Sequence, residues 1–245
     1  MTAIRVLTDA EALAEAAARH VAEAAQAAID ARGAFSISLS GGSTPHHLHL
    51  KLATPPLKSQ IDWAHVHVFF GDERCVPPDD PRSNYRMAEE TLLSKVPIPR
   101  EQIHRMRGEL PPEEAARDYE EQLRQFFKSE PPRLDLILLG MGDNGHTASL
   151  FPGLTAVHEQ TRWVVAEYVA EVRMWRITLT PYVINLARQV MFLVAGSGKA
   201  SMLRQVLEGP YAPDDRPAQI VRPSPGEVIW LVDAAAAAEL SPPPG

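Results

Sequence analysis

The sequence contains one cysteine, Cys75, so no disulfide can form within the chain. No apolar run approaches the roughly 20 residues that a membrane-spanning helix needs. The N-terminal segment carries Asp9, Glu11 and Glu15 where a signal peptide would have an apolar core, so we expect no export signal. Together these absences favour a reducing, cytoplasmic setting and argue against a membrane partner.

Strongly basic segments are also absent. The 24 Lys and Arg residues are outnumbered by 31 Asp and Glu residues, which gives a net charge of −7. This balance argues against nucleic acid as a partner. A small anionic substrate stays open, because a few cations in one pocket suffice to bind it. The sequence does not fix the oligomeric state, for which we expect a monomer or a weak dimer.

Metal-binding signatures are missing as well. His65 and His67 point to one face of a predicted strand, but no third ligand is obvious, and neither an HExxH segment nor paired CxxC segments occur. His46, His47 and His49 are expected on the surface of a helix. We therefore expect no metal site.

What the chain does contain is a repeated alternation of apolar strands and amphipathic helices. Strands are predicted at 35–39, 65–70, 134–139, 163–166, 176–180, 190–195 and 228–232, and helices at 9–32, from 45, at 85–95, from 111 and at 199–207. This order predicts a three-layer α/β fold with a mainly parallel, Rossmann-like sheet and helices on both faces. With no long linker and no fixed-period repeat, residues 1–245 are expected to form one domain.

Ligands of such sheets bind at the carboxyl ends of the strands, where four loops carry unusual residues. The first loop contains Gly41, Gly42, Ser43 and Thr44. Glycines allow a backbone to approach a ligand closely, and free amides at a helix start, with two hydroxyls beside them, form an anion site. A plain helix N-cap uses the same hydroxyl residues, but the combination favours phosphate.

The second loop, from Gly71 to Tyr85, begins with Asp72, Glu73 and Arg74. These residues offer a carboxylate and an anion-binding guanidinium, which makes Asp72 and Arg74 catalytic candidates. A solvated charged turn is the alternative, and the segment alone favours it slightly.

The third loop has the letters of a dinucleotide fingerprint at Gly140, Gly142 and Gly145. That fingerprint requires a long helix, and Pro152 and Gly153 follow too soon for one.

A better indication in the same loop is His146, which lies among glycines and small residues. An imidazole with a pKa near 6.5 suits proton transfer at neutral pH. A histidine that only braces the loop is the alternative.

The fourth loop contains Lys199 in the segment Gly196-Ser-Gly-Lys-Ala200. A P-loop would need glycine at position 193, where this chain has Leu193. Lys199 is then either a point charge for a phosphate or a surface lysine. Arg176 lies within an otherwise apolar strand, so it needs a partner from the protein or from a ligand.

Taken together and in this order, these loops resemble the 6-phosphogluconolactonase family. The matching segments are 38–45, 69–74, 83–85, 138–153, 176–180 and 195–200, of which the run GHTASLFPG is the most specific. They span nearly the whole chain. The family commonly has aspartate just before its Gly-His pair, whereas this chain has Asn144, which can hydrogen-bond but carries no charge. We place Asn144 among the binding residues.

The resemblance implies a fold shared with glucosamine-6-phosphate deaminases and ribose-5-phosphate isomerases. It also implies hydrolysis of 6-phospho-D-glucono-1,5-lactone in the oxidative pentose phosphate pathway, without a cofactor. His146 would take a proton from water and return it to the leaving alkoxide, with Asp72 orienting or polarising the imidazole. Amides near Gly42 or Gly145 would hold the oxyanion. The phosphate would bind Gly42, Ser43 and Thr44, with Arg74, Arg176 and Lys199 nearby.

Two rival functions remain at this point. A glucosamine-6-phosphate deaminase would have a glutamate within an Asn-Glu-Pro pattern, where this chain has Leu150-Phe151-Pro152. Phenylalanine cannot move protons, which counts against that activity. A non-catalytic sugar-phosphate sensor would usually carry a DNA-binding segment, and the sequence has no basic domain for one.

Overall fold

The computed structural model describes residues 2–128 and 130–241, and its main element is a six-stranded parallel sheet. The strands lie in the order β1-β9-β8-β5-β2-β3. Their bounds are β1 (Thr2–Leu7), β2 (Phe35–Leu39), β3 (Val66–Phe70), β5 (Leu136–Leu139), β8 (Gln189–Val194) and β9 (Glu227–Asp233). Every residue of β2 and β5 is buried, as expected of central strands that are covered on both faces.

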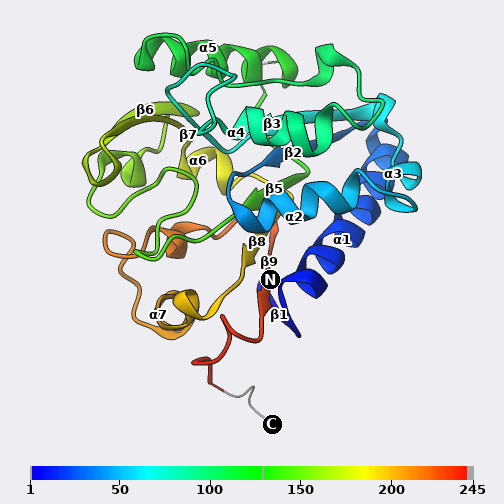
Figure 1. Ribbon diagram of the computed structural model, residues 1–245. Helices are drawn as coiled ribbons and strands as arrows, with labels where there is room; N and C mark the ends of the chain where they lie inside the picture. The colour runs from blue at the N-terminus through cyan, green and yellow to red at the C-terminus, as the bar shows by residue number, and fades with distance from the viewer. Residues whose placement is uncertain (1, 129, 242–245) are drawn as a thin grey trace.

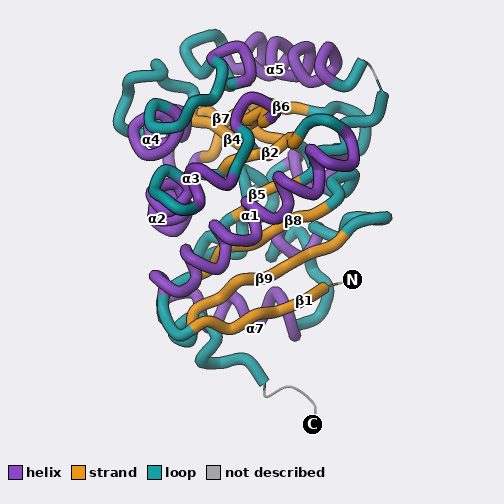
Figure 2. Tube along the Cα trace, turned by 90° about the vertical axis from the view of Figure 1, so that its right-hand side faces the viewer, coloured by secondary structure: helices purple, strands orange, loops and turns teal. Residues whose placement is uncertain are grey.

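Helices cover both faces of this sheet, which confirms the predicted three-layer architecture. The α-helices are α1 (Ala10–Arg32), α2 (Ser43–Leu52), α3 (Leu57–Gln60), α4 (Asn84–Ala88), α5 (Pro112–Phe126), α6 (Pro181–Ile184) and α7 (Ala200–Glu208). Figures 1 and 2 show α1, α2 and α3 on one face and α7 on the other. Shorter helical segments are η1 (Trp63–His65), η2 (Glu89–Leu93), η3 (Arg100–Gln102), η4 (Thr155–His158), η5 (Ala170–Val172), η6 (Ser197–Lys199) and η7 (Pro217–Ile220).

The longest helix, α1, illustrates how local sequence sets an element. Asp9 caps its first turn by accepting a hydrogen bond from the Ala12 amide, and Gly33 ends it in the left-handed conformation with φ of 77°. The alanine-rich stripe between these ends packs into the core. The predicted helix at 9–32 is therefore confirmed.

The order of the strands creates a switch point between β2 and β5. From β2 the chain crosses to β3 on one side, whereas from β5 it continues to β8 and β9 on the other. Loops that leave β2 and β5 thus diverge at the carboxyl edge of the sheet. Ligands of open α/β sheets bind in the crevice that this divergence opens.

A second sheet corrects part of the sequence-based prediction. It has three antiparallel strands in the order β4-β7-β6, with β4 at Asp72–Arg74, β7 at Met174–Leu179 and β6 at Val164–Val169. The strands predicted at 163–166 and 176–180 belong here and not to the main sheet. The loop predicted after Phe70 begins with β4, which is only three residues long and polar. Helix α5 covers β6 and β7 (Figure 1).

Edge strand β1 was not predicted. Nearly all of its residues are exposed, so its sequence lacks the apolar run that indicates a buried strand. His49 was expected on a helix surface, but the structure buries it completely in α2 against Thr91. No helix among the described residues is long and apolar enough to cross a membrane.

Candidate active site

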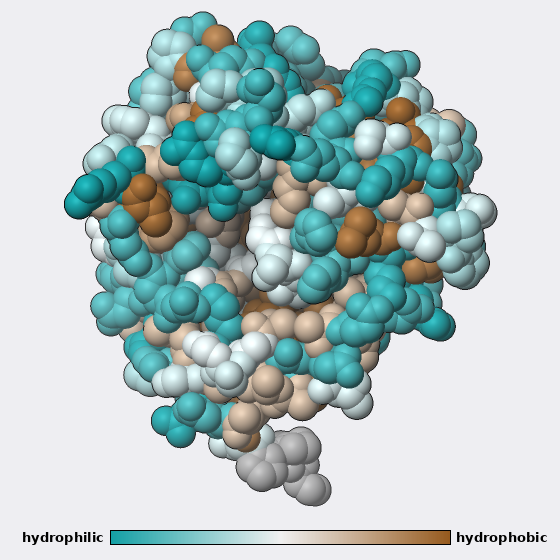
Figure 3. Space-filling view, in the orientation of Figure 1, coloured by the Kyte–Doolittle hydropathy of each residue, from teal (hydrophilic) through white to brown (hydrophobic). Residues whose placement is uncertain are grey.

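A cavity of about 360 Å³ opens at the carboxyl edge of the main sheet, at the switch point. Figure 3 shows it as a hollow near the centre of the molecule. Loops that follow β2, β3, β5 and β8 all contribute to its wall. Seven predicted site residues line it, namely Gly41, Gly42, Asp72, Arg74, His146, Arg176 and Lys199. Ser43, Thr44 and Asn144 lie outside its immediate wall.

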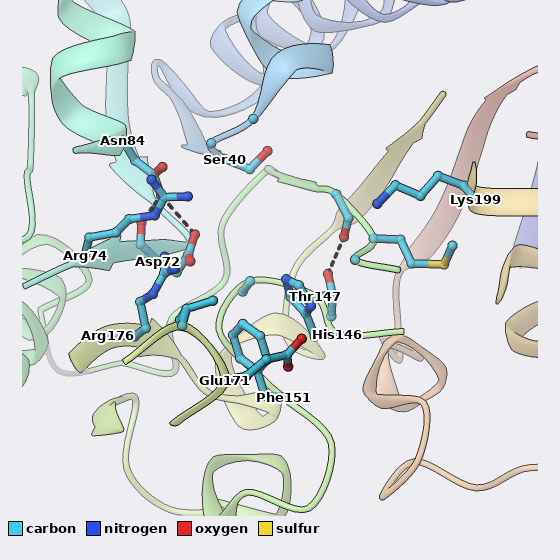
Figure 4. A pocket seen from close by; sticks show the side chains of 17 residues that line it. Ser40, Asp72, Arg74, Asn84, His146, Thr147, Phe151, Glu171, Arg176 and Lys199 are labelled. Carbon is cyan, nitrogen blue, oxygen red and sulfur yellow. Dashed lines mark hydrogen bonds between the residues drawn. The ribbon is translucent and has the colours of Figure 1, made fainter. Parts of the chain in front are cut away.

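His146 lies between the two groups of cations in this cavity, with Arg74 and Arg176 on one side and Lys199 on the other (Figure 4). Its ring stacks on Phe151 with 4.0 Å between the ring centroids. Gly142 lies so close that a Cβ added there would be 2.0 Å from Nδ1. The glycine of the third loop therefore makes room for the imidazole and does not cradle a nucleotide.

Hydrogen bonds from His146 to the Oδ1 atom of Asn144 fix which nitrogen of the imidazole carries the proton. The Oδ1 atom of Asn144 accepts from the backbone amide of His146 at 3.2 Å and lies 2.6 Å from Nδ1. Because the backbone N–H can only donate, Oδ1 faces the histidine and Nδ1 must carry the hydrogen. The Nε2 atom is then left with a free lone pair, and it has no hydrogen-bond partner among the described residues.

Burial lowers the pKa of His146 from 6.5 to about 4, while the nearby Asp72 carboxylate acts in the opposite direction. The imidazole is therefore neutral at pH 7 and able to accept a proton through Nε2.

Among the described residues, the third loop is followed by the short segment η4 and not by an α-helix. This outcome agrees with the rejection of a dinucleotide site.

Asp72 was expected to orient or polarise the imidazole, and no hydrogen bond joins it to His146. Its carboxylate accepts from the Ser149 hydroxyl at 2.6 Å and from the Asn84 amide at 3.1 Å. The effect of Asp72 on the imidazole is electrostatic, because its charge raises the pKa of His146. Orientation is the task of Asn144.

Glu73, the neighbour of Asp72, holds the second loop in place. Its buried carboxylate accepts hydrogen bonds from the backbone amides of Arg74, Asn84 and Tyr85, at 2.7 to 2.8 Å, and from the Ser83 hydroxyl at 3.0 Å. Ser83 in turn caps α4. The charged run in this loop is thus a structural anchor as well as part of the cavity wall.

Arg74 and Arg176 are directly opposite each other on the antiparallel strands β4 and β7. Two like charges in such a pair destabilise a sheet unless an anion lies between or beside them. The Nε atoms of both arginines are buried without a hydrogen-bond partner among the described residues. Burial also lowers the pKa of Arg176, against the pull of Asp72. The pair is therefore a candidate site for an anion.

The first loop adds the N-terminus of α2 to this arrangement. Gly42 precedes the helix with φ of 109°, a conformation that favours glycine, and no side chain caps the first turn. Gly41 lies against Asn84, since a Cβ at position 41 would be 1.9 Å from its Oδ1 atom. An uncapped ten-residue helix leaves its first amides free for an anion.

Lys199 faces the cavity from the other side, where it forms an ion pair with Asp143. It is therefore not an unpaired surface lysine. The Gly145 amide, a candidate oxyanion donor, already donates to the Gly142 carbonyl at 3.0 Å. Of the two donors considered from the sequence, only the Gly42 region stays available.

Three residues of this site were missed from the sequence as participants: Ser149, Asn84 as an amide donor to Asp72, and Glu171. Glu171 lies in η5 at the turn between β6 and β7, and it accepts a hydrogen bond from Asn144 at 3.0 Å. No local pattern could have revealed it, because the contact joins loops 27 residues apart.

Known proteins that are similar to this chain identify its family. The family model described as glucosamine-6-phosphate isomerases/6-phosphogluconolactonase matches residues 8–230. The chain belongs to this family. A 6-phosphogluconolactonase of Nostoc sp. is 42% identical over 243 residues, which cover 97% of this chain and 98% of that protein.

Solved structures agree with this membership. The 6-phosphogluconolactonase from Trypanosoma cruzi superposes with a TM-score of 0.87 at 29% identity, over 99% of this chain and 98% of that one. A monomeric glucosamine-6-phosphate deaminase superposes with a TM-score of 0.80, over 97% of this chain and 99% of that one. Its identity to this chain is 22%, so it shows the shared fold alone.

Proposed function

We propose that this chain is a 6-phosphogluconolactonase, which hydrolyses 6-phospho-D-glucono-1,5-lactone to 6-phosphogluconate in the oxidative pentose phosphate pathway. One observation carries the proposal. A neutral histidine with a free Nε2 lines the same cavity as two opposed arginines, Arg74 and Arg176, whose Nε atoms have no hydrogen-bond partner among the described residues. This arrangement pairs a base with an anion site, as a phosphorylated lactone requires. Relatives that are named 6-phosphogluconolactonase and match over nearly their full length support the proposal.

The proposed reaction begins with water held near Nε2 of His146. As the water oxygen bonds to the lactone carbonyl carbon, Nε2 takes a proton from it and the carbonyl oxygen becomes an oxyanion. The Gly42 amide, which precedes α2, stabilises that oxyanion. The bond between the carbonyl carbon and the ring oxygen then breaks, and the imidazolium returns the proton to the departing alkoxide.

The substrate phosphate binds beside this reaction centre. Arg74 and Arg176 donate hydrogen bonds from one side, with the first turn of α2 next to them, and Lys199 adds positive charge from the other. An arginine fork matches a phosphate in both geometry and charge. In this proposal Ser43 and Thr44 contribute through the helix start of which they are part, and Asn144 acts on His146 instead of on the substrate.

Phe151 bears on the deaminase alternative. It stacks directly on His146, so an apolar ring occupies the place where the rival activity needs a glutamate. Ring opening and deamination require a further proton-transfer group there, and phenylalanine provides none. The observation favours the lactonase over the deaminase. A sensor without activity would not need a base held in one tautomer beside its anion site.

The deciding experiment compares three readouts in the wild-type chain and in His146→Ala. Acid release from the lactone in a pH-stat should be fast in the wild type and nearly absent in the variant. Ammonia release from glucosamine 6-phosphate should be absent in both. Binding of 6-phosphogluconate should persist in the variant. Full lactonase activity in His146→Ala would contradict the assignment of the base, and binding without turnover in the wild type would favour a sensor.

The remaining expectations belong to the same proposal. Residues 1–245 form one domain, as supported by a core cluster that includes residues of both sheets. We propose that the chain works in the cytoplasm, needs no cofactor, and is a monomer or a weak dimer. Cell fractionation and sedimentation at several concentrations test these points.

A further inference from the structure

A second cavity, of about 730 Å³, lies at the opposite edge of the main sheet, where the strands begin. Three arginines from separate parts of the chain line it. Arg32 is in the last turn of α1, Arg133 lies just before β5, and Arg188 just before β8. The active-site cavity follows the carboxyl ends of strands in the same sheet, so the length of the sheet separates the two cavities.

Two carboxylates, Asp135 and Glu227, line the cavity with these three guanidinium groups. The Oδ1 atom of Asp135 accepts from Arg32 at 2.7 Å and lies 3.3 Å from Nε of Arg188. Its Oδ2 atom accepts from the amide and the hydroxyl of Ser36, at 2.9 and 2.8 Å. Both carboxylate oxygens of Asp135 therefore already have partners. The cavity holds three guanidinium groups and two carboxylates, which leaves an excess of one positive charge.

Two arginine donors in this cavity lack an acceptor among the described residues. Arg133 donates through Nη2 to the Pro225 carbonyl at 2.9 Å, but its Nε atom is buried without a partner among the described residues. The Nε atom of Arg188 is also buried, and its contact with Asp135 does not have hydrogen-bond geometry. Burial, with the charges of Arg32 and Arg133, lowers the pKa of Arg188. An anion would supply both the missing acceptors and the missing charge.

Besides the charged groups and the polar residues Gln189 and Ser224, the wall has an apolar part. It is formed by small side chains of α1 and by two prolines before β9, namely Ala24, Ala27, Ala28, Pro223 and Pro225. A cavity with cations at one part and an apolar wall at another suits a ligand that has a charged group and a carbon skeleton. Inorganic phosphate alone would leave that wall uncovered.

We propose that this cavity is a second ligand site, which binds a small organic phosphate with its phosphate group between Arg133 and Arg188. The proposal is independent of the lactonase activity, because no residue of this cavity takes part in the reaction described above. A saturable shift of backbone amide resonances tests it. Inorganic phosphate and adenosine 5′-monophosphate are titrated separately into the ¹⁵N-labelled chain, with Gln189 and Glu227 reporting on this cavity and Gly42 on the active site.

We expect both probes to shift Gln189 and Glu227, and the nucleotide to bind at least tenfold more tightly than inorganic phosphate. Arg133→Gln and Arg188→Gln, made separately, should each weaken these shifts at least tenfold and leave those at Gly42 unchanged. Arg19→Gln removes the same charge from an exposed site on α1 and should change neither set. The amide spectrum itself shows whether each variant is folded.

Two results would overturn the proposal: shifts confined to the neighbourhood of Gly42, or shifts at Gln189 that persist unchanged in both arginine variants. Equal affinity for the two probes would reject the organic part of the ligand. Shifts at Gln189 without any at Gly42 would instead count against the phosphate site of the proposed lactonase.

Discussion

The side-chain amide of Asn144 donates a hydrogen bond to the Glu171 carboxylate, with 3.0 Å between Nδ2 and Oε2. The same amide holds His146 through its oxygen. A negative charge on η5 is thus connected to the imidazole through one neutral side chain. When His146 takes a proton, we expect this polarised amide to stabilise the positive charge on the ring, so Glu171 acts on the base through Asn144.

Removal of this carboxylate should slow turnover without weakening substrate binding. We expect Glu171→Ala to lower kcat about fivefold to tenfold with KM unchanged, since an exposed carboxylate acting through one hydrogen bond contributes about 1 kcal/mol. Asn144→Asp in the Glu171→Ala background returns a charge to the ring and should restore part of kcat. Glu23→Gln, an exposed change on α1, serves as the control for net charge. A rise in KM together with the fall in kcat, without rescue, would indicate a merely structural effect.

The pH dependence of kcat/KM should show a base with an unusually low pKa. His146 must be neutral to accept a proton, and burial lowers its pKa to about 4. Activity should therefore be constant from about pH 7 to pH 5 and fall only as the pH drops through about 4. Asn144→Asp should move this limb to higher pH, because a carboxylate beside the ring favours the imidazolium. An acid limb near pH 6.5 in the wild type would show that burial does not govern this histidine.

Arg176 should matter for binding more than for chemistry. Loss of its guanidinium removes a charge-assisted hydrogen bond to the phosphate, worth about 1.5–3 kcal/mol. We expect Arg176→Ala to raise KM roughly 10- to 100-fold with a much smaller change in kcat. The same variant should bind the unphosphorylated lactone as well as the wild type does. A KM that stays constant for the phosphorylated substrate would remove Arg176 from the phosphate site.

The position of the site follows from the sequence, whereas the contacts within it depend on pairings between distant segments. Strand–loop–helix order placed Gly42, Asp72, His146 and Lys199 at one edge of the sheet, because consecutive parallel strands end on the same side. The opposition of Arg74 and Arg176 needed the pairing of β4 with β7, a contact between segments about a hundred residues apart. No periodicity in either segment announces such a pairing.

The roles of Gly142 and Asn144 escaped prediction for a related reason. Both depend on the exact path of one loop, which brings a glycine against an imidazole and turns an amide oxygen toward it. Glycine in a loop usually indicates a backbone conformation that other residues avoid, whereas Gly142 is needed because a side chain there would collide with the imidazole. The sequence could identify the loop as unusual but not the atoms that face each other within it.

Gly142→Ala should therefore displace the catalytic ring while the fold persists. A Cβ at this position would lie 2.0 Å from Nδ1 of His146, so the ring must move and its bond to Asn144 must break. A misplaced catalytic group can cost about 100-fold in rate, and we expect a loss of that order in kcat with a nearly unchanged melting temperature. Gly198→Ala, where nothing lies within 4 Å of the added carbon, should keep wild-type activity. Equal kinetics for the two variants would contradict this account of Gly142.

The buried His49 should make the fold sensitive to mild acid. Its Nδ1 lies 3.0 Å from the Thr91 hydroxyl, while Nε2 is buried without a partner among the described residues, and burial lowers its pKa to about 3. Because the unfolded chain protonates this histidine near pH 6.5, stability is present above that value and is lost as the pH falls toward 3. Between pH 7 and pH 5 the loss amounts to about 2 kcal/mol for this residue alone.

Urea unfolding of His49→Gln tests this assignment, since glutamine keeps an N–H donor and cannot take up the proton. We expect the variant to lose about 2 kcal/mol less stability than the wild type between pH 7 and pH 5, whatever its stability at pH 7. His47→Gln, on the exposed face of the same helix, should follow the wild type. If His49→Gln also follows the wild type, another group must carry the acid sensitivity, and the neutral state assigned to His49 would be wrong.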